Sequence, residues 1–164
     1  MFFGKIDKLN WGNRLFEEQI IGKLKQYLGA ECFLEEPFSK GGKMFMCIDK
    51  KWLKPTIEFL KSNGTTHLSA ITGLEVADGI ELLYHLSNGN TLLTIVLRLP
   101  LNEPVVASIT NIIRGAIPYE QEIHDLFGVE FEGHPNLDPL ILPDDWPKGL
   151  YPLRKSRTQK KRRK

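Results

Sequence analysis

The sequence has only two cysteines, Cys32 and Cys47, and they do not form a CxxC pair. Disulfide frameworks, zinc ribbons and cysteine-ligated iron–sulfur clusters need more cysteines or closer spacing, so all three are disfavoured. A GxGxxG loop, a P-loop, a nucleophile elbow and an HExxH motif are also absent. We therefore predict two buried thiols, with no catalytic residue, no metal site and no cofactor in this chain.

Long apolar runs are lacking as well. The stretch Leu92–Leu97 is interrupted by Thr94 and is far shorter than the roughly 20 residues that cross a bilayer as a helix. The first residues, MFFGKIDKLN, do not combine a basic start with an apolar stretch, so we expect no secretory signal. The hydrophobic fraction of 41% and the charged fraction of 26% predict one compact domain with a hydrophobic core.

The net charge of +2 conceals an uneven distribution of charge along the chain. The last eleven residues, RKSRTQKKRRK, contain eight of the 22 basic residues and no acidic one. We expect residues 156–164 to form a separate basic tail that seeks an anionic surface. Nucleic acid, anionic lipid headgroups and a partner protein are open as targets. A nucleic-acid-binding module is the alternative of another class, but no RRM, KH or helix-turn-helix pattern supports it.

Periodicity in the first 117 residues predicts an α+β domain, with helices packed on a mixed sheet of four to five strands. The expected helices cover residues 13–28, 50–64 and 108–114. The expected strands cover residues 31–36, 43–49, 66–76, 79–87 and 91–100. The last two strands flank Asn88-Gly89, a strong hairpin signal because both residues tolerate positive φ.

The character of the chain changes after residue 117. Six of the ten prolines fall within the last 47 positions, and proline removes backbone donors and interrupts regular elements. We predict a short helix from Pro118 to Phe127, ended by Gly128. Beyond it we predict an extended segment, residues 129–155, here named the strap. Its apolar residues need cover from its own domain or a partner, and its length favours a partner.

The predicted helix is rich in ionisable groups, which leaves metal binding, acid–base chemistry and docking as alternatives. The sequence EIHD has no second histidine four residues on, and His124 and His134 are ten residues apart. Glu120 and Glu122 crowd a helix N-terminus, where negative charge is already favourable. We therefore interpret this helix as part of a docking surface.

Three ordered motifs carry a family resemblance: EQEIHDLFGVEFEGHP, LILPDDWP and YPLRK. They resemble the C subunits of respiratory complex I, a family that includes the matching subunit of complex I-related membrane-bound NiFe hydrogenases. IHDLFG and DDWPKGLYPLRK are more similar to the hydrogenase branch. The alternative is the equivalent subunit of a NADH- or ferredoxin-dependent quinone oxidoreductase.

The resemblance implies a non-catalytic peripheral-arm subunit on the cytoplasmic side of the cell membrane, which it meets only through its complex. Its partners would be a large subunit, with a NiFe centre or a quinone site, and a neighbouring iron–sulfur subunit. The NiFe centre and iron–sulfur clusters would lie in those partners, and no nucleic acid is implied.

The expected partner interface combines the family motif with two further residues, His124 and Trp146. Tryptophans in an extended segment are frequent anchors of interfaces. The complete set is Glu120, Glu122, His124, Asp125, Phe127, Gly128, Gly133, His134, Pro135, Trp146, Pro152, Leu153, Arg154 and Lys155. We expect Arg154 and Lys155 to pair with acidic groups of the large subunit. The sequence departs from the family pattern at Gln121 and at Asp138-Pro139, where the family usually has arginines.

Overall fold

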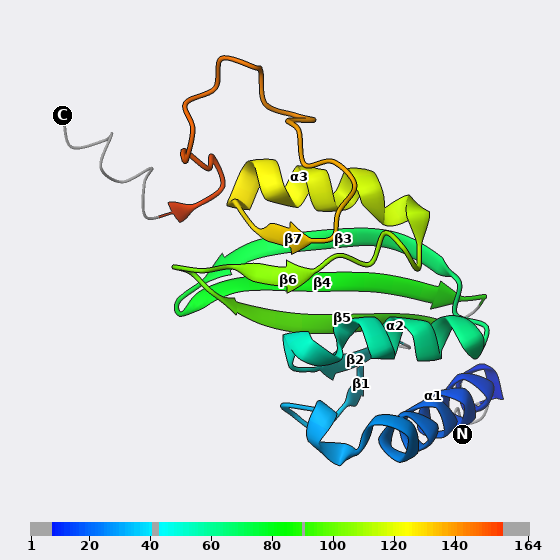
Figure 1. Ribbon diagram of the computed structural model, residues 1–164. Helices are drawn as coiled ribbons and strands as arrows, with labels where there is room; N and C mark the ends of the chain where they lie inside the picture. The colour runs from blue at the N-terminus through cyan, green and yellow to red at the C-terminus, as the bar shows by residue number, and fades with distance from the viewer. Residues whose placement is uncertain (1–7, 41–42, 90, 156–164) are drawn as a thin grey trace, which may run out of the picture.

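The computed structural model describes residues 8–40, 43–89 and 91–155, with side chains from residue 18 onward. Its centre is a five-stranded sheet of order β1-β2-β5-β4-β3, in which β2 and β5 are parallel and the other pairs antiparallel (Figure 1). The strands are β1 (Phe38–Lys40), β2 (Lys43–Cys47), β3 (His67–Val76), β4 (Gly79–Asn88) and β5 (Thr91–Pro100). The predicted α+β fold with a mixed sheet is confirmed.

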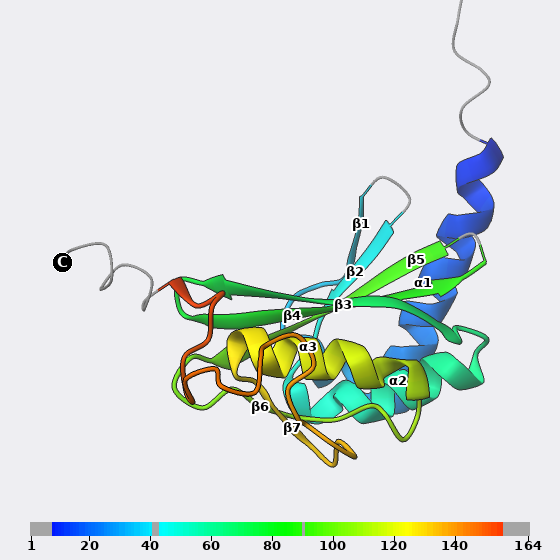
Figure 2. The same ribbon diagram turned by 90° about the horizontal axis from the view of Figure 1, so that it is seen from above.

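Three helices accompany the sheet: α1 (Lys8–Leu28), α2 (Leu53–Ser62) and α3 (Ile117–Phe127). Short 3-10 turns are η1 (Ala30–Cys32), η2 (Lys50–Trp52) and η3 (Arg114–Ala116). A second, parallel sheet consists of β6 (Val105–Ala107) and β7 (Glu130–Glu132). Seen from above, α2, α3, β6 and β7 all lie on one side of the five-stranded sheet (Figure 2).

The core follows from the alternation of buried and partly covered residues along β4. In β4 the side chains of Ile80, Leu82, Tyr84 and Leu86 are fully buried, while the residues between them are only partly covered. Alternate residues of a strand face opposite sides of a sheet, so these four face the helices. Gly73 of β3 lets α3 approach closely, because a Cβ there would lie 2.8 Å from Ile123 Cδ1.

Two predicted elements are wrong. Residues 31–36 contain the end of η1 and a single bridge from Phe33 to Ile48, and the edge strand β1 begins only at Phe38. Residues 108–113 form a turn rather than a helix, and Arg114 begins η3. Ser108 Oγ lies 2.7 Å from Thr110 Oγ1 and accepts a bond from the Thr110 N–H, and such local bonds compete with helical ones.

The other helix predictions hold in kind, with shifted boundaries. The first helix begins at Lys8 instead of Asn13, and α2 begins at Leu53 after η2, where Asp49 accepts a bond from the Lys51 N–H. Within the described residues, no helix is both long and apolar enough to cross a membrane. The basic tail lies outside the described residues.

Candidate partner-docking site

Helix α3 is the platform on which the strap rests. Pro118 occupies its first turn, and Gly128 ends it with a left-handed φ of 65° and an N–H that donates to the His124 carbonyl at 2.7 Å. The helix presents Ile123 and Phe127 to the core, both nearly fully buried. Its opposite side is therefore free to hold the strap.

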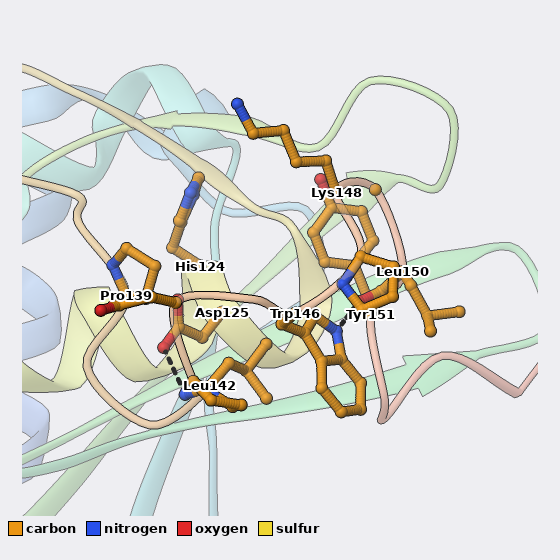
Figure 3. Close-up of a pocket in the computed structure, with 12 residues that line it drawn as sticks. His124, Asp125, Pro139, Leu142, Trp146, Lys148, Leu150 and Tyr151 are labelled. Carbon is orange, nitrogen blue, oxygen red and sulfur yellow. Dashed lines mark hydrogen bonds between the residues drawn. The ribbon is translucent and has the colours of Figure 1, made fainter.

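Asp125 fixes the middle of the strap to this helix. Its side chain is 5% exposed, and Oδ2 accepts three backbone N–H groups, from Leu140 at 2.8 Å, Ile141 at 2.8 Å and Leu142 at 3.3 Å. Figure 3 shows the carboxylate directed from α3 towards the backbone of Leu142. Hydrogen bonds to a charged acceptor are about twice as strong as neutral ones. This single carboxylate therefore shapes the strap into a tight arc.

Arg154 fixes the end of the strap to the same domain. Its Nε donates to the Phe127 carbonyl at 2.6 Å, and its terminal nitrogens lie 3.4 Å from the Leu101 carbonyl and 3.5 Å from the Gly128 carbonyl. The guanidinium also lies 4.7 Å from the centre of the Tyr151 ring, a cation–π distance. The motif predicts that this residue pairs with a partner's carboxylate. In the structure it binds carbonyl groups of its own chain, and its pairing with a partner stays a prediction.

Lys155 likewise forms hydrogen bonds with its own chain. Its backbone N–H donates to the carboxylate of Glu75, and its Nζ donates to the Glu75 carbonyl at 2.9 Å. Glu75 is only 8% exposed and lies on the helix-covered side of β3. Lys155 is nonetheless exposed, so its expected pairing with a large subunit stays a prediction.

A cavity of about 290 Å³ lies between the arc of the strap and α3 (Figure 3). His124 and Asp125 line it from the helix, and the strap lines it mainly with rings and aliphatic groups: Pro139, Leu142, Pro143, Trp146, Pro147, Leu150 and Tyr151. Trp146 is half-buried, and its Nε1 donates to the Leu150 carbonyl at 2.7 Å. Its role as an interface anchor stays a prediction, and the bond shows that it also closes a turn of the strap.

His124 and His134 both form hydrogen bonds with backbone groups. His124 Nδ1 donates to the Val129 carbonyl at 2.9 Å, and Glu130 Oε2 lies 3.9 Å from the same nitrogen. His134 Nε2 donates to the Ile117 carbonyl at 3.2 Å, while its Nδ1 accepts the Asn136 N–H. Within the described parts of the chain, no three His, Cys, Asp or Glu side chains lie together as metal ligands would.

Several expected interface residues do not reach the surface. Glu120 is fully buried, Phe127 is 4% exposed and belongs to the core, and Asp125 is occupied by the strap. In this conformation these three side chains are covered by their own chain, and their part in a partner interface stays a prediction. Exposed or partly exposed members of the predicted set are Glu122, His124, Gly128, Gly133, His134, Pro135, Trp146, Pro152, Leu153, Arg154 and Lys155.

Glu75 and Tyr151 belong to the site, although the sequence motifs do not single them out. Glu75 could have been found from its strand register, because it takes an inward-facing position of β3 together with Ile71 and Gly73. A carboxylate at such a position needs a partner. The two positions at which the sequence departs from the family pattern are in contact: Gln121 Nε2 donates to the Asp138 carbonyl at 3.3 Å.

Gly128→Ala is expected to destabilise the packing of the strap against the end of α3. An alanine Cβ at this position would overlap the ring of Tyr151, and the left-handed backbone alone costs about 1–2 kcal/mol for a residue with a side chain. We expect a lower midpoint of urea unfolding. Gly133→Ala, which also has a positive φ but open space around it, is the matched control and should cost less. Equal losses would show that Tyr151 moves aside freely.

Comparison with known proteins agrees with this architecture. Residues 46–163 match the family model described as the 30 Kd subunit of the respiratory-chain NADH dehydrogenase. The chain is 32% identical over 147 residues to the C subunit of the F(420)H(2) dehydrogenase of Methanosarcina mazei, covering 87% of this chain and 89% of that protein.

Two solved structures share the fold. A chain of the membrane-bound sulfane sulfur reductase, an archaeal respiratory membrane complex, superposes with a TM-score of 0.73 and 25% identity, covering 90% of this chain and 91% of the other. A trypsin-resistant fragment of Nqo5 superposes with a TM-score of 0.60 and 22% identity, covering 76% and 99%. The chain thus belongs to the family of the 30 Kd subunit of the respiratory-chain NADH dehydrogenase and is a subunit of a complex I-related respiratory membrane complex.

Proposed function

We propose that this chain is a non-catalytic docking subunit of the peripheral arm, and that the strap is its contact with the large subunit of the complex. The observation that carries this proposal is the way Asp125 and Arg154 anchor the strap while apolar side chains stay uncovered. Leu140, Ile141 and Leu153 are 48%, 56% and 51% exposed. Apolar groups held at the surface on an anchored segment are typical of a protein–protein interface.

The large subunit is proposed to be of the NiFe hydrogenase type, in a ferredoxin-linked, ion-translocating complex on the cytoplasmic side of the membrane. This rests on the resemblance of IHDLFG and DDWPKGLYPLRK to the hydrogenase branch. The NiFe centre and the iron–sulfur clusters would then lie in the large subunit and a neighbouring iron–sulfur subunit. This chain would supply shape and contacts and take no part in electron transfer.

A second candidate has its own support. The similarity to the F(420)H(2) dehydrogenase subunit extends over nearly the whole of both chains. This favours a complex that oxidises a reduced coenzyme and delivers the electrons to a membrane acceptor. In that case the large subunit would line an acceptor site and would lack nickel ligands.

Purification of the native complex through this chain separates the two candidates. A large subunit with paired CxxC motifs, stoichiometric nickel and hydrogen-dependent reduction of a dye would support the hydrogenase type. A large subunit without those cysteines, together with oxidation of a reduced coenzyme, would support the second candidate. The chain purified alone is expected to contain no stoichiometric metal or flavin. Recovery of RNA or ribosomal proteins in place of a large subunit would contradict both.

A further inference from the structure

Glu120, in the first turn of α3, is a buried acid with an incomplete set of hydrogen bonds. Its side chain is 0% exposed. One oxygen, Oε1, accepts the Ile109 N–H at 2.9 Å. The other, Oε2, is buried without a hydrogen-bond partner among the described residues. Burying an ionised carboxylate with an unpaired oxygen is expensive, and such groups usually become neutral instead.

Tyr84 provides a second, independent sign of an unusual site. Its side chain is fully buried in β4, on the side of the sheet that faces the helices. Its hydroxyl likewise has no hydrogen-bond partner within the described chain. Burial raises the pKa of Tyr84 well above its usual value, and the nearby charge of Glu120 raises it further.

The charges around Glu120 are few. Burial raises its pKa to about 7, against the lowering effects of the Ser108 hydroxyl, of the Ile109 N–H and of the charge on Lys54 in α2. The other titratable groups on elements packed against α3 are occupied elsewhere or exposed: Glu75 and His67 of β3, Arg114 of η3, and Glu130 and Glu132 of β7. Tyr84 and Lys54 are therefore the titratable groups that act together with Glu120.

Glu120 also joins two parts of the chain. It bonds the 108–113 turn through Ile109 to the start of α3, and five residues later the same helix carries Asp125, the anchor of the strap. A charge created at Glu120 would have to be hydrated, which requires the turn and the helix to separate.

We propose that Glu120 is a buried proton-binding site. While it is protonated, it holds α3 against the sheet and the 108–113 turn, and loss of the proton loosens this contact. The packing of α3, and through Asp125 the position of the strap, then depends on pH near neutrality. This proposal concerns the isolated chain and goes beyond its docking role.

The sign of the pH dependence follows from the two states. The unfolded chain releases the Glu120 proton near a pKa of 4.5, the ordinary value, whereas the folded chain keeps it up to a pKa of about 7. Between these values the folded state holds more protons, so the contribution of Glu120 to stability falls as the pH rises. Above about pH 7 both states are ionised and the loss reaches a plateau.

Glu120→Gln, in the full chain, tests the site by thermal unfolding between about pH 5 and about pH 8. Glutamine has the same shape and never ionises, so the variant should melt above the wild type by a margin that widens with pH and levels off above about pH 7. From the raised pKa we expect a margin on the order of 5–10 °C at high pH. Glu122→Gln, two residues away and exposed, is the control and should parallel the wild type. A margin for Glu120→Gln that does not change with pH would overturn the proposal.

A second measurement needs no variant. In wild-type protein carrying ¹³C-labelled glutamate, one side-chain carboxyl signal should titrate at about pH 7, well above the ordinary value for glutamate. If every glutamate titrates at the ordinary value, the site does not exist, even if Glu120→Gln fails to fold. Amide exchange of Ile109 then tests the coupling. Above about pH 7 it should be faster in the wild type than in Glu120→Gln at the same pH, and equal rates would overturn the loosening of the junction.

Discussion

Replacing Asp125 with asparagine is expected to release the strap from α3 and to prevent assembly with the large subunit, while the five-stranded core stays folded. Asparagine keeps the shape but loses the charge that three N–H groups share. A hydrogen bond to a charged group contributes about 1.5–3 kcal/mol, so we expect the local opening free energy of the strap to fall by about 3 kcal/mol or more. Hydrogen exchange of the Leu140, Ile141 and Leu142 amides measures the release, and co-purification measures assembly.

The control for this experiment is Asp144→Asn. Asp144 is an exposed acid of the strap that lines the same cavity, so this variant makes the same chemical change without touching the anchor. It should exchange and assemble like the wild type. Slow exchange of the three amides in Asp125→Asn, together with intact assembly, would show that the carboxylate does not hold the strap.

Arg154→Ala is expected to lower the stability of the isolated chain as well as its assembly. A guanidinium paired with a partner's carboxylate, as the motif predicts, would affect assembly alone. The structure directs its donors to carbonyl groups of Phe127, Leu101 and Gly128. Removing the side chain leaves these half-buried carbonyl groups without their donor, which should lower the free energy of unfolding by an amount on the order of 2–3 kcal/mol. The midpoint of urea unfolding should fall accordingly.

Arg154→Lys is the matched variant, since it keeps the charge and loses the planar fork that reaches several acceptors at once. It should fall between the wild type and alanine. Deletion of residues 157–164 should do much less than either, because exposed charges are screened within about 8–10 Å at physiological salt. An unchanged unfolding midpoint in Arg154→Ala, combined with failed assembly, would show that this residue acts at the partner interface alone.

Helix α3 shows which features of the site residue patterns can predict. Pro118 and Gly128 correctly mark its ends, because the first turn of a helix tolerates proline and a left-handed C-terminal residue favours glycine. The acidic residues between them share one predicted docking surface. The fold separates them: Glu120 enters the core, Glu122 faces solvent, and Asp125 binds the strap. Helical spacing assigns residues to faces, but it does not say which face another segment will cover.

Local signals in the chain were enough to establish the fold class, the central strands and the end of α3, since alternation in β4 and β5 and the hairpin at Asn88-Gly89 involve near neighbours. What the charged groups bind depends on long-range packing. The contact of Lys155 with Glu75 joins residues 80 positions apart, and that of Arg154 with Leu101 joins residues 53 apart. A charge is bound by whichever group the folded chain brings within about 3 Å, and that depends on the whole domain rather than on neighbouring residues. The burial of Glu120 has the same origin, because α3 packs close to the sheet where Gly73 leaves room for it.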